Sequence, residues 1–332
     1  MSDRISIVYN DPALGRLHNL GESDAVMGVL EAVDNVSTAL RKLGYEPETV
    51  RLQPPLSLAK KHLAMLKADI VFNLFEGFDG IPGSEATIAQ TLEKKGTRFT
   101  GSPSRALMLS ENKAEEKKVL RDSGVPTPDS QLLSPETISQ FNLKLPCIIK
   151  PLGQHASHGI SEESVVGDFG ALRKRVEFVF ASYSCFSLVE EFVSGREFSA
   201  LVVGNEKPKL FPIEEIVYAL PPGKPHILTY AAKWVPGHEY FTGTKIKCPA
   251  DVTPEVARRV EELAIRSFTA LGCRGYARVD MRQARNGNIM VLEVNPNPDI
   301  SSAGGARMQA EAAGLDYVAF INEILSLATS GG

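Results

Sequence analysis

The sequence contains one tryptophan and four cysteines, and the cysteines (Cys147, Cys185, Cys248 and Cys273) are far apart, with no C-x-x-C spacing. This spacing provides neither a disulfide framework nor a cysteine-based zinc site, and it favours reduced thiols in a cytosolic protein. No apolar run reaches the length of a transmembrane helix, and the N-terminus lacks a secretory signal. We therefore expect a cytoplasmic protein that has no membrane partner.

The chain has no large excess of either charge, because its formal net charge is only −4. No overall basic field would attract nucleic acid, so we expect no nucleic-acid partner. The sequence has no G-x-x-x-x-G-K-[ST] loop and no G-x-S-x-G turn, which argues against a Walker-type phosphate loop and a serine hydrolase. The length of 332 residues suits two or three domains.

The first hundred residues alternate short apolar strands with amphipathic helices. Such alternation predicts βαβ units and a parallel sheet, whose ligands gather at the carboxyl ends of the strands. The loop 73–84 lies at such an end and carries Glu76. The expected elements are strands at 4–9, 50–52 and 68–74 and helices at 26–43 and 56–66.

The remaining two thirds of the chain favour mixed helices and strands around a proline-rich, loop-like segment, 207–249. Asn286-Gly287 indicates a tight hairpin between the last two strands. The expected helices are 104–123, 168–181, 254–271 and 303–329, and the expected strands are 147–151, 188–193, 195–203, 276–281 and 288–295.

Three oxygen-bearing side chains mark the predicted hairpin. Asp280 lies near the end of one strand, and Glu293 and Asn295 are two residues apart on the next, so they share a face. Two carboxylates and an amide suit Mg²⁺, which takes its remaining ligands from phosphates and water. On spacing alone, ordinary polar residues at strand ends explain this pattern equally well.

Two lysines and an acidic strand end are further candidates for a binding site. Lys150 closes an apolar strand before a Gly/Ser loop, where it can meet a phosphate, and Lys113 begins a helix. The strand end 190–193, followed by Glu197, can hold adenine through its backbone and ribose through a carboxylate. Taken singly, these are also ordinary features of solvated strand ends.

In this order along the chain, the motifs resemble those of the ATP-grasp superfamily and most closely those of the D-alanine–D-alanine ligases. The resemblance covers nearly the whole chain. The segments that carry it are 110–113 (SENK), 148–151 (IIKP), 189–198 (VEEFVSGREF), 232–233 (AK), 271–280 (LGCRGYARVD) and 293–295 (EVN).

The resemblance implies an α/β fold, α+β in its ATP-binding part, with an N-terminal substrate-side domain (1–101), a central domain (102–189) and a C-terminal domain (190–332). It also implies ATP and Mg²⁺ as cofactors, with Mn²⁺ as an alternative metal, and a homodimer. The implied ATP ligands are Lys113, Lys150, Ser157, Glu190, Phe192, Val193, Glu197 and Lys233; the implied metal ligands are Asp280, Glu293 and Asn295; and the implied catalytic residues are Arg278 and Lys233.

The substrate-binding positions depart from the family pattern. Ala156-Ser157 replaces a serine pair, and Trp234 replaces the tyrosine that follows the lid lysine. Alanine has no donor and tryptophan donates only its ring N–H, so they cannot rebuild the family's hydrogen-bonded set. The serine expected after the metal strand falls near Gly304. The candidate substrate residues are Glu22, Asp24, Glu76, Trp234, Ser301 and Ser302.

We therefore expect an ATP-dependent ligase that joins a small carboxylate and an amine through an acyl phosphate, on an amino acid or peptide other than the family's usual substrate. Three alternatives stay open: an orthodox D-alanine–D-alanine ligase, an ATP-binding protein without turnover, and a kinase, which would not need Arg278.

Overall fold

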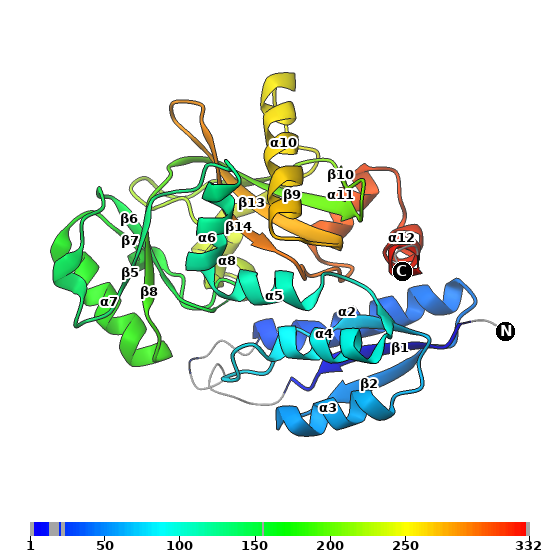
Figure 1. Ribbon diagram of the computed structural model, residues 1–332. Coiled ribbons are helices and arrows are strands. Elements are labelled where there is room, and N and C mark those ends of the chain that lie inside the picture. The colour runs from blue at the N-terminus through cyan, green and yellow to red at the C-terminus, as the bar shows by residue number, and fades with distance from the viewer. Residues whose placement is uncertain (1–2, 13–19, 21–23, 155, 330–332) are drawn as a thin grey trace.

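The computed structural model describes residues 3–12, 20, 24–154 and 156–329, and these residues form three sheets with helices packed on them (Figure 1). Two sheets form the upper part of the molecule in Figure 1, and the N-terminal sheet lies below them. None of the helices within the described residues combines the length and the apolar character that crossing a bilayer requires.

The N-terminal sheet is parallel, as predicted, with the strand order β2-β1-β3-β4. Alternate side chains face opposite sides, so Ile7 packs toward α2 and α12 while Val8 packs toward α3 and α4. The elements of this part are β1 (Ile5–Asn10), α2 (Asp24–Lys42), β2 (Glu48–Leu52), α3 (Leu56–Met65), β3 (Ile70–Leu74), α4 (Ser84–Lys95) and β4 (Arg98–Phe99).

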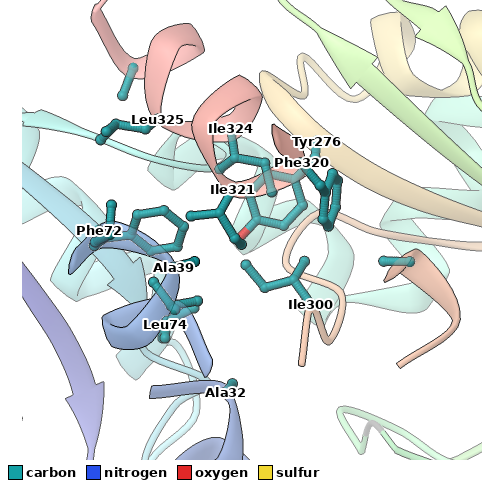
Figure 2. Close-up of a cluster of buried hydrophobic side chains, with 14 of the residues drawn as sticks. Ala32, Ala39, Phe72, Leu74, Tyr276, Ile300, Phe320, Ile321, Ile324 and Leu325 are labelled. Carbon is teal, nitrogen blue, oxygen red and sulfur yellow. The ribbon is translucent and has the colours of Figure 1, made fainter. Parts of the chain in front are cut away.

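The C-terminal helix α12 (Tyr317–Thr329) connects the N-terminal sheet to the rest of the molecule. Figure 2 shows Phe320 and Ile321 of this helix in one cluster with Phe72 of β3 and with Tyr276 of β13, which belongs to another sheet. All four side chains are fully buried. Burying side chains of this size stabilises a protein by roughly 1.5–3 kcal/mol each, so α12 helps to fix the two sheets relative to each other.

The central sheet is antiparallel, with the order β5-β8-β6-β7, and α7 covers its apolar face. Lys150 and Glu190 lie on the strands β6 and β8, which are direct neighbours. The elements are β5 (Ser130–Leu133), η1 (Ile138–Gln140), β6 (Cys147–Pro151), η2 (Glu162–Ser164), β7 (Val165–Val166), α7 (Phe169–Tyr183) and β8 (Ser187–Glu191).

The C-terminal sheet is antiparallel, with the order β12-β11-β9-β13-β14 and β10 beside β9. Phe198 and Val279 face α10, whereas Ser199 and Asp280 face the opposite side. The elements are β9 (Gly195–Gly204), β10 (Lys209–Leu210), β11 (Glu214–Tyr218), β12 (Thr244–Lys247), α10 (Pro254–Ala270), β13 (Gly275–Ala284) and β14 (Ile289–Asn295). The hairpin predicted at Asn286-Gly287 joins β13 to β14, and Gly287 has the positive φ (88°) that its turn requires.

Each of two segments that were predicted as one helix contains two separate helices. The segment 104–123 is divided at Asn112 into α5 (Ser104–Glu111) and α6 (Lys113–Asp122), because the Asn112 side chain caps α6 by accepting the Glu115 N–H. The segment 303–329 contains α11 (Gly305–Ala312) and then α12, with Gly314 at φ +85° between them.

The prediction that 207–249 is loop-like was wrong in part. This segment contains β10, β11 and β12 and two short helices, α8 (Tyr230–Trp234) and α9 (Glu239–Gly243). Frequent prolines mask short elements in a sequence pattern, but β11 gains hydrogen-bonded neighbours on both sides when it pairs with β9 and β12.

Candidate active site

A cleft lies between the central and C-terminal sheets, with a volume of about 960 Å³ that includes space open to solvent. Its lining combines apolar side chains with a few convergent charged groups, which is typical of small-molecule and cofactor sites. Among the predicted site residues, those that line it are Lys113, Lys150, Ser157, Glu190, Phe192, Val193, Glu197, Lys233, Arg278, Asp280, Glu293 and Asn295.

A buried carboxylate and two lysines form one wall of the cleft. Lys150 Nζ lies 2.7 Å from Glu190 Oε2, and Lys117 pairs with Glu190 Oε1. Burial opposes ionisation of Glu190, but the two ammonium groups lower its pKa to about 2. Lys117 was missed in the sequence, although it follows Lys113 by four residues and therefore shares a helix face with it.

A second buried ion pair lies beside the first. Glu197 and Arg282 pair on adjacent strands, and the Tyr218 hydroxyl donates to Glu197 Oε2 at 2.6 Å. Arg282 also donates to the Val193 carbonyl at 2.9 Å, and its guanidinium lies over the Phe192 ring. Sequence reasoning missed Arg282, although it follows Asp280 by two residues and so shares its face.

The three predicted metal ligands come together at the β13–β14 hairpin. Asp280 and Glu293 are directly paired across the two strands, so their Cβ atoms are about 5 Å apart, and Asn295 is two residues along on the same face. An irregularity in the strand pairing after Asp280 lets both Val291 and Val294 face α10 while Glu293 still faces the cleft.

Protein cations contact both carboxylates of this set. Arg278 holds Asp280 with two hydrogen bonds of 2.9 and 2.8 Å, Ser199 Oγ donates to Asp280 at 2.8 Å, and Lys113 pairs with Glu293. No group of three or more His, Cys, Asp or Glu side chains within the described residues is arranged to hold a metal. Two carboxylates and one amide are nevertheless hard-oxygen donors that fit Mg²⁺, provided that phosphate and water oxygens complete its shell.

Lys233 and Trp234 belong to the short helix α8. Burial and the nearby Arg278 charge lower the pKa of Lys233. The Trp234 ring N–H donates to the Ala156 carbonyl at 3.2 Å, and the ring lies against α2, where a β-carbon at Gly28 would be 3.7 Å away. The tryptophan therefore joins α8 to the loop that carries Ser157.

The predicted substrate residues within the described part of the chain, Trp234 included, are not among those that line this cleft. Ser301 Oγ donates to Asp299 at 3.0 Å, and Ser302 donates to Glu31 and through its backbone N–H to Asn35, both on α2. Their hydroxyls are therefore used within the protein. Glu22 and the side chain of Asp24 lie outside the described residues.

An acidic group surrounds Glu76, near the carboxyl end of β3. Enclosure by the surrounding protein, and then the carboxylates of Asp299 and Glu85, raise the pKa of Glu76, although its side chain remains accessible to water. Burial raises the pKa of Glu85 to about 8, and Asn297 donates to its carboxylate at 2.7 Å. Glu85 was not singled out in the sequence as a site residue, because its position on α4 gives no sign of this packing.

Comparison with known proteins relates both the sequence and the fold to one group of enzymes. A family model described as "D-ala D-ala ligase C-terminus" matches residues 119–326, which is more than half of the chain. The chain is 30% identical to the D-alanine--D-alanine ligase of Desulforudis audaxviator, over 88% of this chain and 91% of that protein.

Two further similarities extend over almost the whole chain. The protein y4sG of Sinorhizobium fredii, described as uncharacterized, is 29% identical over 98% of this chain and 96% of its own length. The crystal structure of D-alanine--D-alanine ligase from Bacillus anthracis complexed with ATP has the same fold, with a TM-score of 0.75 and 22% identity over 99% of this chain and 97% of that chain.

Proposed function

Because the chain belongs to the D-alanine–D-alanine ligase family, it is an ATP-dependent ligase that forms C–N bonds, and we propose that its substrate is an amino acid or peptide other than the D-alanine pair. The observation that best supports ligase chemistry is the convergence of Lys150, Lys233 and Arg278 on one cleft beside two paired carboxylates. These residues come from the central sheet, α8 and the C-terminal sheet.

We assign the nucleotide to the end of the cleft that is lined by Phe192 and Val193. The apolar side chains would hold adenine, and Glu197, fixed by Arg282 and Tyr218, would accept ribose hydroxyls. The implied phosphate ligands are Lys113, Lys150, Ser157 and Lys233, and Glu190 would hold Lys150 in place. Charge-assisted contacts to phosphate are the strong hydrogen bonds of such sites.

We assign the metal to Asp280, Glu293 and Asn295. Bound there, Mg²⁺ would neutralise phosphate charge and make the γ-phosphorus easier to attack. In the structure Arg278 contacts Asp280 and Lys113 contacts Glu293. When ATP and Mg²⁺ bind, these two cations would give up some of these hydrogen bonds and donate to phosphate oxygens instead. Both residues are therefore close to the groups whose negative charge grows during transfer.

The proposed reaction has two steps. A donor carboxylate oxygen attacks the γ-phosphorus and ADP leaves, which produces an acyl phosphate. The acceptor amine loses a proton to solvent, its nitrogen attacks the acyl carbon, and the C–O bond to phosphate breaks. Arg278 would stabilise the oxyanion of the second step, and Lys233 and Trp234 would form a lid that excludes water.

The substrate proposal depends on Ala156 and Trp234. Their mutual hydrogen bond involves a backbone carbonyl and a ring N–H, so no side-chain hydroxyl is available there for a substrate. A binding site that lacks the groups its usual substrate needs loses discrimination for that substrate. We also propose three domains, 1–101, 102–189 and 190–332, with α12 packed against the first of them.

Measuring ADP and phosphate release tests this proposal, with amino acids and dipeptides as donors, with amino acids, dipeptides and simple amines as acceptors, and with mass spectrometry of the products. We expect turnover with a donor other than D-alanine. Robust formation of D-alanyl-D-alanine at ordinary substrate concentrations would contradict the substrate proposal and favour the orthodox ligase. ATP binding without ADP formation from any pair would favour a non-catalytic ATP-binding protein, and a stable phosphorylated product would favour a kinase.

A further inference from the structure

Glu214 of β11 lies in the same row of side chains as the proposed metal ligands. It pairs with Ser199 of β9, Ser199 pairs with Asp280 of β13, and Asp280 pairs with Glu293 of β14. Directly paired residues of an antiparallel sheet share one face. Glu214 therefore lies on the same face of the sheet as Asp280, two strands away, although it is not among the residues that line the cleft.

The carboxylate of Glu214 is buried, and one of its two oxygens lacks a hydrogen-bond donor. Glu214 is 4% exposed, and its Oε2 atom has no hydrogen-bond donor among the described residues. Burial raises the pKa of Glu214 to about 7, an effect that Arg278 and Lys233 oppose and Asp280 reinforces. Leaving a buried acceptor unpaired is costly, which suggests that a ligand supplies the donor.

The first residues of α11 (Gly305–Ala312) pack closely against the Glu214 carboxylate. A β-carbon at Gly305 would lie only 2.5 Å from Glu214 Oε2, and one at Gly304 would lie 3.0 Å from Asp299 Oδ2. The first turn of a helix favours negative charge, and here two carboxylates of the protein itself lie beside it. A substrate carboxylate would therefore meet two like charges at this place.

Along the strands Glu214 is level with Asp280, and therefore away from the end of the cleft that we assign to the nucleoside. Along β13, Arg282 is near the nucleoside end of the cleft, Asp280 follows, and Arg278 is farthest from that end. Lys233 and Arg278 are close enough to Glu214 to influence its charge. A group bound by Glu214 would therefore lie next to the acyl phosphate but away from adenine.

We propose that Glu214 determines acceptor specificity by binding the acceptor's ammonium group, and that it selects amines with no carboxylate on the neighbouring carbon. This inference rests on the ligase function proposed above. The bound ammonium must release one proton to solvent before its nitrogen attacks the acyl carbon and phosphate leaves. The acceptor class is thus simple alkyl amines and diamines rather than α-amino acids.

Matched acceptors test the proposal in the full-length enzyme with ATP and Mg²⁺. Hydroxylamine first traps the acyl phosphate as a hydroxamate, which identifies a donor without any acceptor. With that donor, ethylamine is compared with alanine, and 1,4-diaminobutane with ornithine, because each pair differs only in a carboxylate. We expect the amine without the carboxylate to have a KM at least about 10-fold lower in each pair, the ratio that loss of one charged hydrogen bond gives.

The variant Glu214→Gln keeps the shape and removes the charge. We expect it to raise the KM for the acceptor amine about 10- to 100-fold, much more than it raises the KM for ATP. We also expect the ratio of the two KM values within each pair of acceptors to become smaller. The matched control is Glu215→Gln, since Glu215 faces the other side of β11 and pairs with Arg196. Because the wild-type comparison needs no variant, a Glu214→Gln protein that fails to fold does not leave the proposal untested.

The outcomes separate the two proposals. If hydroxamate forms but alanine and ornithine are used as well as or better than their partners, the role of Glu214 is refuted and the ligase function stands. Equal effects of Glu214→Gln and Glu215→Gln would also refute it. If no donor gives either hydroxamate or ADP, the ligase function itself fails.

Discussion

Buried carboxylates near the proposed nucleotide end of the cleft have cationic partners, whereas two buried carboxylates near the proposed substrate end do not, within the described part of the chain. Glu190 is held by two lysines, and Glu197 by an arginine and a tyrosine. Among the described residues, Glu85 and Glu214 have no ion pair with lysine or arginine, and burial raises the pKa of each. The proposed nucleotide end is therefore already balanced in charge, whereas at the proposed substrate end burial favours the protonated carboxyl, and a cationic ligand would favour the ionised form.

The largest expected effect concerns the carboxylates that we assign to the metal. Replacing Asp280 by Asn, or Glu293 by Gln, should lower the rate of ADP formation by about 1000-fold, because each removes charge that would hold Mg²⁺ against the phosphates. A steady-state assay with a Mg²⁺ titration measures this. Glu215→Gln serves as the control, and a variant of Asp280 with normal rates would show that the metal site is elsewhere.

The next effect concerns stability at the end of the cleft that we assign to the nucleotide. Glu190→Gln leaves Lys117, which is 1% exposed on its side chain, and Lys150 without their anion. We expect the free energy of unfolding to fall by about 3–5 kcal/mol, the usual cost of breaking a buried ion pair from one side.

Urea unfolding followed by circular dichroism measures that loss. Because the pKa of Glu190 is lowered to about 2, its stabilisation should be complete above pH 4.5 and be lost as the pH falls toward 2. An unfolding midpoint for Glu190→Gln equal to that of the wild type would contradict the view that this end is balanced by pairing.

Two glycines provide a contrast of smaller size. Gly305→Ala would place a β-carbon against Glu214, so we expect a loss of about 2 kcal/mol that Glu214→Ala largely restores. Gly287→Ala meets nothing within 4 Å and suffers only from its positive φ, at a cost of about 1 kcal/mol that Glu214→Ala does not restore. A double-mutant cycle of unfolding free energies separates the two cases. If the effects of Gly305→Ala and Glu214→Ala simply add, the proposed contact between the two residues is contradicted.

The smallest expected effect concerns Glu85, a buried carboxyl group that has no cationic partner among the described residues. The pKa of Glu85 is about 8 in the folded protein, above its ordinary value of 4.5, so its ionisation should lower stability as the pH rises between those values. Glu85→Gln keeps an acceptor for Asn297 and should raise stability by about 1–2 kcal/mol at pH 8.5. Unfolding at pH 5.5 is the control, where the gain should be smaller; an equal gain at both pH values would show that Glu85 does not titrate in this range.

Much of the fold follows from local patterns. The strands β1 to β3 and the helices between them were predicted because their apolar residues recur with clear periods. The splits at Asn112 and Gly314 were missed because capping and helix-ending residues are common within longer helical patterns. The strand β11 was missed because prolines surround it and its stability comes from β9 and β12.

The sequence by itself determined which residues form the hairpin face. Period-two spacing and Asn286-Gly287 are enough to place Glu293 beside Asp280, because both are local properties of two adjacent strands. Only the tertiary structure decided which charges are balanced. Lys117 reaches Glu190, and Glu214 meets Gly305, across separations that no local pattern encodes, since such contacts depend on how the sheets and helices pack together.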